Sequence, residues 1–275
     1  MKKIEQVGVV GAGTMGRGIA QVFALHDYQV TLIDRDESIL EGALEKVRER
    51  TPAELWDKVK GLIRTSTDIK AVKDCDIVIE AVFEEMGVKK EIFKALNGVC
   101  KKDAVIASNT SALSITELSG CLDDPSRFIG MHFMNPPKVM KLVEVEKGEK
   151  TSKETLDTVV ELARKIEKVP AVVNDSPGFI SNRLLFALIG EALRLLERGV
   201  AGKEDIDTVM KYGMNHPMGP IELADFMGLD ICLDIMKTLY KDLNDERYKP
   251  TRTLESLVKA GKLGRKTKEG FYRYE

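Results

Sequence analysis

The chain has 275 residues, of which 43% are hydrophobic, and its 42 lysine and arginine side chains nearly balance its 44 aspartate and glutamate side chains. This is the composition of an ordinary folded protein, and the length predicts about two domains. The charge balance excludes a protein that binds nucleic acid through bulk positive charge, and no apolar run approaches the roughly 18 residues of a membrane-spanning helix. We therefore expect neither a nucleic-acid nor a membrane partner.

The opening residues predict where the protein resides. Residues 1–5 read MKKIE, and a strand-like run and a glycine-rich turn follow at once. A secretory signal would require an apolar segment of roughly 7–15 residues after the basic start. We therefore expect a cytoplasmic protein.

The first functional signal is a glycine-rich turn between an apolar strand and a helix. Residues 6–10 (QVGVV) predict a strand, GAGTMG follows, and RGIAQVFALH has the pattern of a helix. Gly11 would make the tight bend, Gly13 would let the backbone approach a pyrophosphate, and Gly16 would let the helix pack closely on the strand. Free N–H groups and the helix dipole would then hold the phosphates. The residues expected at the cofactor are Gly11, Ala12, Gly13, Thr14, Met15 and Gly16.

An acidic residue at the end of the next strand indicates which dinucleotide binds. Residues 29–33 (QVTLI) predict this strand, and Asp34 follows it, about 20 residues after the turn, as dinucleotide-binding proteins require. A carboxylate there accepts hydrogen bonds from the ribose hydroxyls and repels a 2′-phosphate, so we expect NAD rather than NADP. Arg35 would soften that repulsion. The alternative interpretation is an ordinary tight turn.

Further strand-like runs alternate with helical stretches. The runs are residues 76–81, 104–107, 128–131 and 142–145, and the helical stretches include 88–99 and 114–119. This alternation predicts an α/β Rossmann fold with a doubly wound, mostly parallel sheet covered on both faces.

The least regular segment is residues 36–65. Its pattern predicts a helix, a break at Thr51–Pro52 and a second helix through Leu62. Its basic side chains form either a solvated face or a small lid over an anionic substrate. They are Lys46, Arg48, Arg50, Lys58, Lys60 and Arg64.

Polar residues follow the later strands, where a doubly wound sheet binds its ligand. The run Ser108–Ser111 comes directly after residues 104–107, and its alternative role is to cap the helix that begins near Ser114. His132 follows another apolar strand, and Glu144 stands in the apolar run KLVEVE. An unpaired buried carboxylate is costly, so one interpretation is a His132–Glu144 hydrogen bond, the arrangement of a general base and its orienting acid. The alternative is that His132, as a lone histidine beside a strand, is structural.

The rest of the chain has the character of a helical domain. The apolar stripes of the long helix that follows residue 177 lie on two sides, so it is expected to be buried on two sides. Asn182 lies on one stripe and needs either a backbone partner or a ligand. Later helices are expected at 203–212, 220–227, 230–243 and 253–260. We expect the domains to be residues 1–176 and 177–275.

The cysteines and histidines argue against a structural metal. Such a site needs ligands at close spacing, whereas the four cysteines and three histidines are widely separated. They are Cys75, Cys100, Cys121, Cys232, His26, His132 and His216. We expect no metal.

Five motifs in order resemble the L-3-hydroxyacyl-CoA dehydrogenases, and most closely the short prokaryotic 3-hydroxybutyryl-CoA dehydrogenases. The motifs are GAGTMGRGIA, SNTSALSI, GMHFMNPPKVMKLVEV, DSPGFISNRLL and NHPMGPIELADFMGLD. The resemblance spans essentially the whole chain. It implies an NAD-binding Rossmann domain, a helical domain for substrate binding and dimerisation, a homodimer, an acyl-CoA substrate, and oxidation of (S)-3-hydroxyacyl-CoA.

The resemblance also implies roles for individual residues. His132 and Glu144 match the catalytic pair, and Ser111 and Asn182 match the residues that hold the substrate. Further cofactor contacts are implied for Asn135, Glu84, Lys89 and Ser111.

The chain departs from the family pattern in three places. Met134 replaces a phenylalanine, Gly190 replaces an asparagine of the long helix, and the 36–65 segment is shorter than in many relatives. Because this segment helps to bind the CoA moiety in the family, individual CoA contacts stay unassigned. Two alternative functions remain. One is a dehydrogenase of the same fold that acts on a free hydroxy acid or sugar acid of the gulonate type. The other is an NAD-binding structural protein without activity.

Overall fold

The structure is a computed structural model in which residues 3–275 are described. The chain forms two compact units, one ending at Ser176 and the other spanning Pro177–Glu275. Each unit has its own hydrophobic core.

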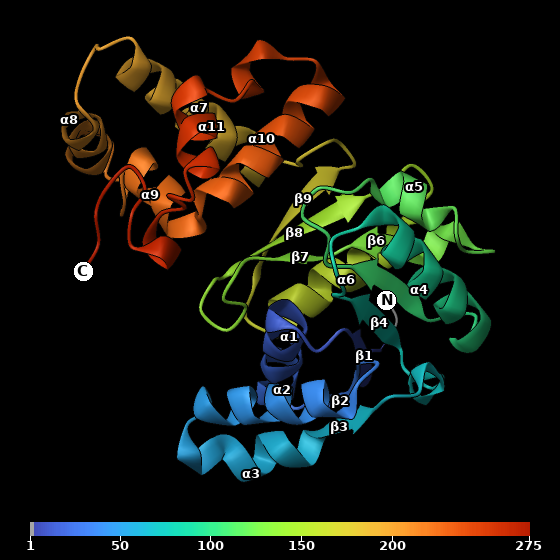
Figure 1. The fold of residues 1–275 in the computed structure, drawn as a ribbon. Helices are drawn as coiled ribbons and strands as arrows, with labels where there is room; N and C mark the ends of the chain where they lie inside the picture. Colours follow the sequence, from blue (N-terminus) through green and yellow to red (C-terminus); the bar gives the residue numbers. More distant parts are fainter. Residues whose placement is uncertain (1–2) are drawn as a thin grey trace. The chain divides into compact units, whose positions relative to one another are not determined.

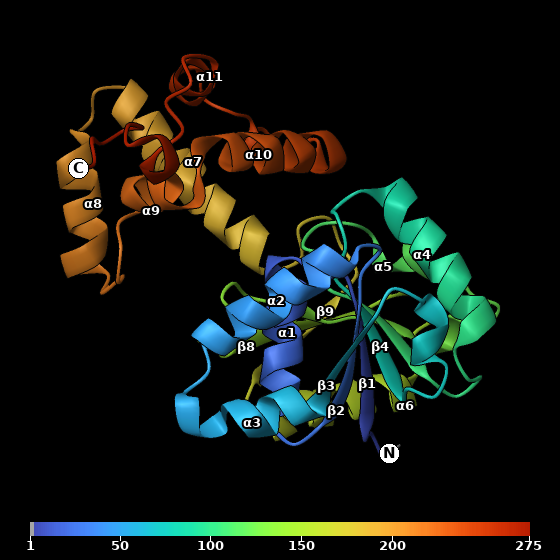
Figure 2. The same cartoon turned by 60° about the horizontal axis from the view of Figure 1, so that its bottom comes forward.

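The first unit is built on a six-stranded sheet with the strand order β3-β2-β1-β4-β5-β6 (Figures 1 and 2). Every neighbouring pair of these strands is parallel. The strands are β1 (Gln6–Val10), β2 (Gln29–Ile33), β3 (Ile63–Ser66), β4 (Ile77–Glu80), β5 (Val105–Ser108) and β6 (Phe128–Gly130). The expected α/β Rossmann fold, doubly wound and mostly parallel, is confirmed.

Helices cover both faces of this sheet. One core cluster joins strand residues to α1, α2, α3 and α6, so these helices share a face. Ile129 of β6 belongs to that cluster, whereas its neighbour Phe128 points to the opposite face and packs edge-on against Phe93 of α4, with 4.8 Å between ring centroids. Helix α4 therefore covers the other face. The helices are α1 (Thr14–Leu25), α2 (Glu37–Glu49), α3 (Ala53–Leu62), α4 (Met86–Val99), α5 (Ile115–Ser119) and α6 (Lys153–Lys165).

Strand β3 was not predicted from the sequence. The two helices of the 36–65 segment are present as α2 and α3, but the chain then enters β3 beside β2. This strand has only four residues, IRTS, and only Ile63 is buried. A short, half-polar strand at the edge of a sheet gives no clear apolar pattern.

A smaller sheet with the strand order β7-β8-β9 completes the first unit. Strand β7 (His132–Phe133) pairs antiparallel with β8 (Leu142–Lys147), which pairs parallel with β9 (Val169–Asn174). Strand β9 was also missed, because Pro170 lies inside it and prolines are confined to edge strands such as this one.

The second unit is helical. Its core contains Phe186, Ile189, Leu193, Met236 and Leu254, each fully buried. The helices are α7 (Ser181–Glu197), α8 (Lys203–Thr208), α9 (Pro220–Met227), α10 (Leu229–Leu243) and α11 (Arg252–Lys259). They agree with the predicted stretches, except that the end of 203–212 is a π turn, Val209–Gly213. The all-α character of this unit is confirmed.

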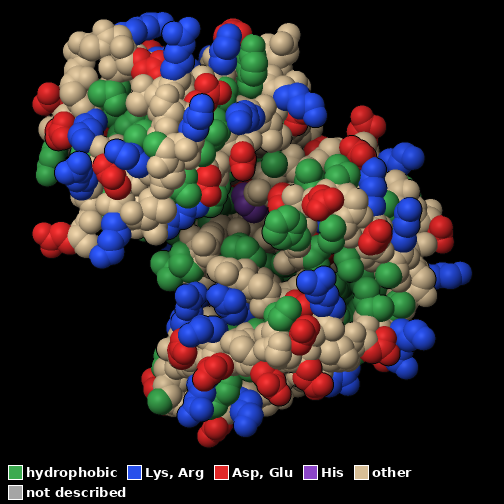
Figure 3. All heavy atoms as spheres, viewed as in Figure 1, with side chains coloured by type: hydrophobic (Ala, Val, Ile, Leu, Met, Phe, Trp, Pro, Cys, Tyr) green, Lys and Arg blue, Asp and Glu red, His purple; other side chains and the backbone are tan. Residues whose placement is uncertain are grey.

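The molecular surface mixes charges of both signs, as Figure 3 shows for one face. Within the described range 3–275, no helix combines the length and apolarity needed to cross a membrane.

Candidate active site

The glycine turn has the geometry of a phosphate cradle. Gly11 has φ of +101°, and a Cβ there would lie 2.5 Å from the carbonyl oxygen of Ala81. A Cβ on Gly16 would lie 1.7 Å from the carbonyl oxygen of Gly11, so helix α1 approaches the strand as closely as a glycine allows. Gly13 is the N-cap of α1, and no side chain caps this helix end. A Cβ added at Gly13 would have nothing within 4 Å. The turn therefore leaves open space at the positive end of a helix, which suits a pyrophosphate.

Asp34 ties the end of β2 to this turn. Its Oδ2 accepts a hydrogen bond from the N–H of Ala12 at 2.7 Å, and its Oδ1 accepts one from the N–H of Arg35 at 2.8 Å. A carboxylate has about four acceptor positions, so two backbone bonds leave capacity for ribose hydroxyls. The contact with a cofactor stays a prediction.

A buried ion-pair network lies between β4 and α4. Lys89, with its side chain 1% exposed, places its Nζ 2.6 Å from Oε1 of Glu80 and 3.1 Å from Oε2 of Glu84. Burial raises the pKa of Glu80, although Lys89 opposes this effect. Burial also favours a higher pKa for Glu84, but the charge of Lys89 and the hydrogen bond from Thr110 outweigh it, so the pKa of Glu84 is lowered. Glu84 is thereby held as a carboxylate.

Glu84 organises the polar turn after β5. Its Oε1 accepts hydrogen bonds from the Thr110 hydroxyl at 2.5 Å and from the Ser111 N–H at 2.7 Å. The structure thus joins three predicted site residues, since Lys89 holds Glu84 and Glu84 holds Ser111. The observed partners of Lys89 are carboxylates under the turn, and its implied contact with the cofactor remains a prediction.

Asn109 links this turn to the next strand. Its Oδ1 accepts a hydrogen bond from the backbone N–H of Phe133 at 2.9 Å. Asn109 lies in the polar run Ser108–Ser111 that the sequence analysis singled out, although without a role of its own, whereas Glu80 was not singled out. The available signal for Glu80 was an acidic residue at the end of the apolar run DIVIE.

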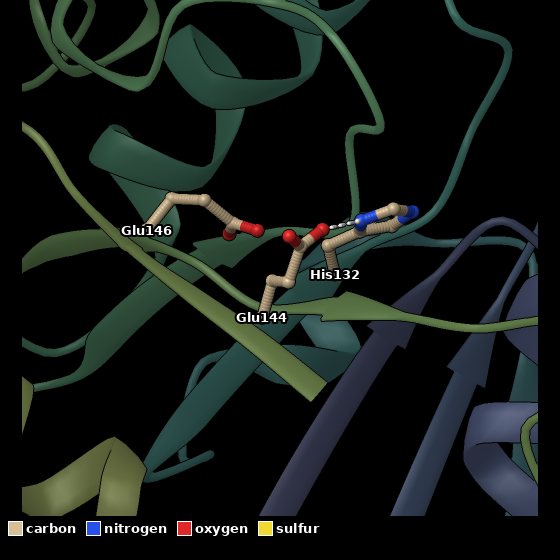
Figure 4. A group of neighbouring side chains, drawn as sticks. All are labelled: His132, Glu144 and Glu146. Carbon is tan, nitrogen blue, oxygen red and sulfur yellow. Dashed lines mark hydrogen bonds and ion pairs between the residues drawn. The ribbon is translucent and has the colours of Figure 1, made fainter. Parts of the chain in front are cut away.

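His132 and Glu144 face each other across β7 and β8. They are directly paired in the antiparallel register, and His132 Nδ1 lies 3.0 Å from Glu144 Oε2 (Figure 4). His132 is 9% exposed and Glu144 is 1% exposed. A hydrogen bond at Nδ1 fixes the orientation of the ring and leaves Nε2 as the nitrogen for proton exchange with a substrate.

The remaining predicted residues lie as follows. Asn135 is exposed in the loop after β7, and Asn182 is half-buried in the first turn of α7, in the second unit. Their roles stay predictions.

A third acid lies beside the His132–Glu144 pair. Glu146 is fully buried, and one side-chain ligand atom from each of His132, Glu144 and Glu146 lies within 4.8 Å of the other two (Figure 4). Such a group has the donor types that hold a metal ion. The sequence-based expectation of no metal considered cysteine and histidine spacing only, and it stays a prediction.

Together, the parallel sheet, the glycine cradle, the acidic strand end and the imidazole–carboxylate pair beyond β6 define a Rossmann-fold dehydrogenase. Family comparison makes the assignment specific. Residues 6–176 match the NAD-binding domain of 3-hydroxyacyl-CoA dehydrogenase, and residues 178–274 match its C-terminal domain. The chain belongs to the 3-hydroxyacyl-CoA dehydrogenase family.

Individual relatives span the whole chain. A probable 3-hydroxybutyryl-CoA dehydrogenase of Deinococcus radiodurans is 46% identical over 97% of this chain and 99% of its own length. The 3-hydroxybutyryl-CoA dehydrogenase of Clostridioides difficile is 45% identical over 98% of this chain and 99% of its own length. The crystal structure of (S)-3-hydroxybutyryl-CoA dehydrogenase PaaH1 from Ralstonia eutropha superposes with a TM-score of 0.95 at 41% identity, covering 99% of this chain and all of that one.

Proposed function

We propose that this enzyme catalyses the reversible oxidation of (S)-3-hydroxyacyl-CoA, with 3-hydroxybutyryl-CoA as the substrate, to 3-oxoacyl-CoA. The observation that carries the proposal is the buried His132–Glu144 pair, with its 3.0 Å contact, just beyond the carboxyl end of β6. Relatives of full-length similarity bear the name 3-hydroxybutyryl-CoA dehydrogenase.

The residues of the first unit fit a dinucleotide cofactor. The open space at Gly13 and the uncapped start of α1 suit the pyrophosphate, and Asp34 suits an unphosphorylated ribose, which supports NAD over NADP. Asn135, Glu84 and the Ser111 turn are the further candidates for contact. When bound, NAD supplies the hydride acceptor for C3 of the substrate.

The protein's contribution is a positioned base. In oxidation, Nε2 of His132 takes the proton of the C3 hydroxyl as the carbonyl forms, and returns it in the reverse direction. Glu144 holds the ring through Nδ1 and stabilises the imidazolium. In the first unit, Ser111, whose N–H is held by Glu84, would hydrogen-bond the substrate and help to hold C3 in position for transfer. For Asn182, a substrate contact is implied by the family resemblance alone.

The assay for this proposal follows NADH absorbance with acetoacetyl-CoA as the substrate and a blank without enzyme. Rapid oxidation of NADH supports the proposal, and no turnover would leave the chain an inactive NAD-binding protein. Free acetoacetate is the matched control. Equal activity on acetoacetate and its thioester would favour a free hydroxy-acid dehydrogenase instead.

We also propose that the enzyme is a cytoplasmic homodimer. Large apolar side chains of the second unit are exposed, including Leu184 at 69% and Tyr212 at 82%. Exposed apolar surface of this kind marks interaction sites. Light scattering of the purified protein should give the mass of two chains, whereas a monomer mass would refute the dimer.

A further inference from the structure

Glu146 is a buried acid that the proposed reaction does not use. It lies two residues after Glu144 on β8, and alternate residues of a strand point to the same face. Its side chain therefore extends beside that of Glu144, and Figure 4 shows Glu144 between Glu146 and His132. Glu146 is 0% exposed, and neither of its carboxyl oxygens makes a hydrogen bond of good geometry, although the backbone N–H groups of His132 and Glu146 lie close enough to oppose the rise in its pKa.

The neighbouring strand leaves room for this carboxyl group. A Cβ on Gly130 of β6 would lie 2.1 Å from Oε2 of Glu146 and 2.8 Å from its Cβ. Any larger residue at position 130 would displace the acid. The absence of a side chain at Gly130 therefore leaves space for the Glu146 side chain beside the His132–Glu144 pair.

The surroundings of Glu146 disfavour a second negative charge. The titratable groups that face it are Glu144 on its own strand, His132 on β7 and Asp175 after β9. Among residues 3–275, none forms an ion pair with Glu146. Burial, and next the charge of Glu144, raise the pKa of Glu146 well above its ordinary value. Two carboxylates this close in a buried site do not both ionise.

We propose that Glu146 is a positioning residue, a neutral carboxylic acid that donates its proton in a hydrogen bond to Glu144 and so fixes the orientation and single negative charge of the His132–Glu144 pair. This inference rests on the proposed function, because it assigns a role to a neighbour of the proposed base. One carboxyl oxygen of Glu146 lies within 4.8 Å of one of Glu144, so a side-chain rotation that closes this gap would give the hydroxyl an acceptor.

A purely structural residue at this position would be apolar. An unpartnered buried acid destabilises the fold relative to an apolar side chain of similar volume. Acids kept neutral by their surroundings are used elsewhere in catalysis because they donate a hydrogen bond. The presence of an acid at position 146 is therefore consistent with a role as hydrogen-bond donor to Glu144.

The test compares Glu146→Met with Glu146→Gln in the full-length enzyme. Methionine has a similar length but no donor, whereas the glutamine amide donates like the neutral acid. For Glu146→Met we expect a raised thermal midpoint together with a kcat about tenfold lower or more, the fold-change associated with a hydrogen bond to a charged group. The KM for NADH should stay unchanged. Glu146→Gln should recover most of the lost kcat.

A second measurement needs no turnover. The infrared difference spectrum of wild type minus Glu146→Gln should contain the carbonyl band of a protonated carboxylic acid at neutral pH. A carboxylate band instead would overturn the proposal. So would an unchanged kcat in Glu146→Met, or one stoichiometric divalent cation bound to the purified protein and lost in that variant. Because the infrared and thermal readouts are independent of the substrate, they separate failure of this inference from failure of the proposed function.

Discussion

His132 and Glu144 occupy directly opposed positions in the antiparallel pair β7–β8, and their side chains meet at 3.0 Å on one face of that ribbon. Directly opposed residues have Cβ atoms about 5 Å apart, so the strand pairing itself sets the distance between the imidazole and the carboxylate. The register of the small sheet thus brings the two side chains together.

The first prediction concerns the orienting acid. Glu144→Gln keeps an oxygen near Nδ1 of His132 but removes the negative charge that we propose stabilises the imidazolium. We expect kcat to fall by roughly a hundredfold or more, with little change in NADH affinity, as measured by steady-state kinetics and fluorescence titration. Glu149→Gln, the same change at an exposed position after the strand, is the control and should keep wild-type turnover.

A second prediction concerns cofactor choice. Asp34→Asn keeps an acceptor for the Ala12 N–H but loses the charge that we propose faces the ribose. NAD should bind about tenfold more weakly, because a hydrogen bond to a charged group is lost. NADP affinity should change less, since repulsion of its 2′-phosphate is relieved. Titration with both dinucleotides checks this, and equal losses would remove Asp34 from the ribose site.

A third prediction separates buried from exposed ion pairs. Lys89→Met leaves Glu80 and Glu84 without their shared cation, and breaking a buried pair costs about 3–5 kcal/mol of unfolding free energy. Lys90→Met breaks the more exposed pair with Glu117, which solvent screens, and should cost far less unfolding free energy. Urea denaturation of both variants measures the difference. Similar costs would show that the Lys89 network does not stabilise the fold.

A fourth prediction follows from the raised pKa of Glu146. Its proton is bound in the folded state at pH values where the unfolded chain has already lost it. The contribution of Glu146 to the free energy of unfolding therefore falls as pH rises above about 4.3, the ordinary pKa of a glutamic acid. Methionine does not titrate, so the stability advantage of Glu146→Met over wild type should be small at pH 4–5 and grow toward pH 8. Thermal unfolding of both proteins at several pH values measures this difference in stability. A difference that does not change with pH would contradict a raised pKa of Glu146.

Local patterns were sufficient to predict much of the fold. Strands β1 and β2 and the glycine turn are short-range features, because their apolar runs and glycines act within a few residues. Strand β3 was missed because a four-residue edge strand has too little apolar pattern, and β9 because Pro170 argues against a strand.

The candidate site required more than pattern. The His132–Glu144 pairing was expected from the cost of a buried carboxylate, but its register depends on how residues 134–141 return the chain, which spacing does not encode. Lys89 was expected at the cofactor, whereas its observed carboxylate partners lie nine residues before it and five residues before it in the chain. Glu146 was not considered in the sequence analysis. That it shares a buried face with Glu144 follows only once β8 is known to be a strand that is buried on both faces.

The most direct test of the account is the kcat of His132→Gln with acetoacetyl-CoA and NADH, measured beside NADH binding by the same protein. If His132 is the acid and base of the reaction, kcat falls by roughly 10²–10⁴ while NADH affinity stays within about twofold of wild type. Turnover at the wild-type rate in this variant would contradict the account.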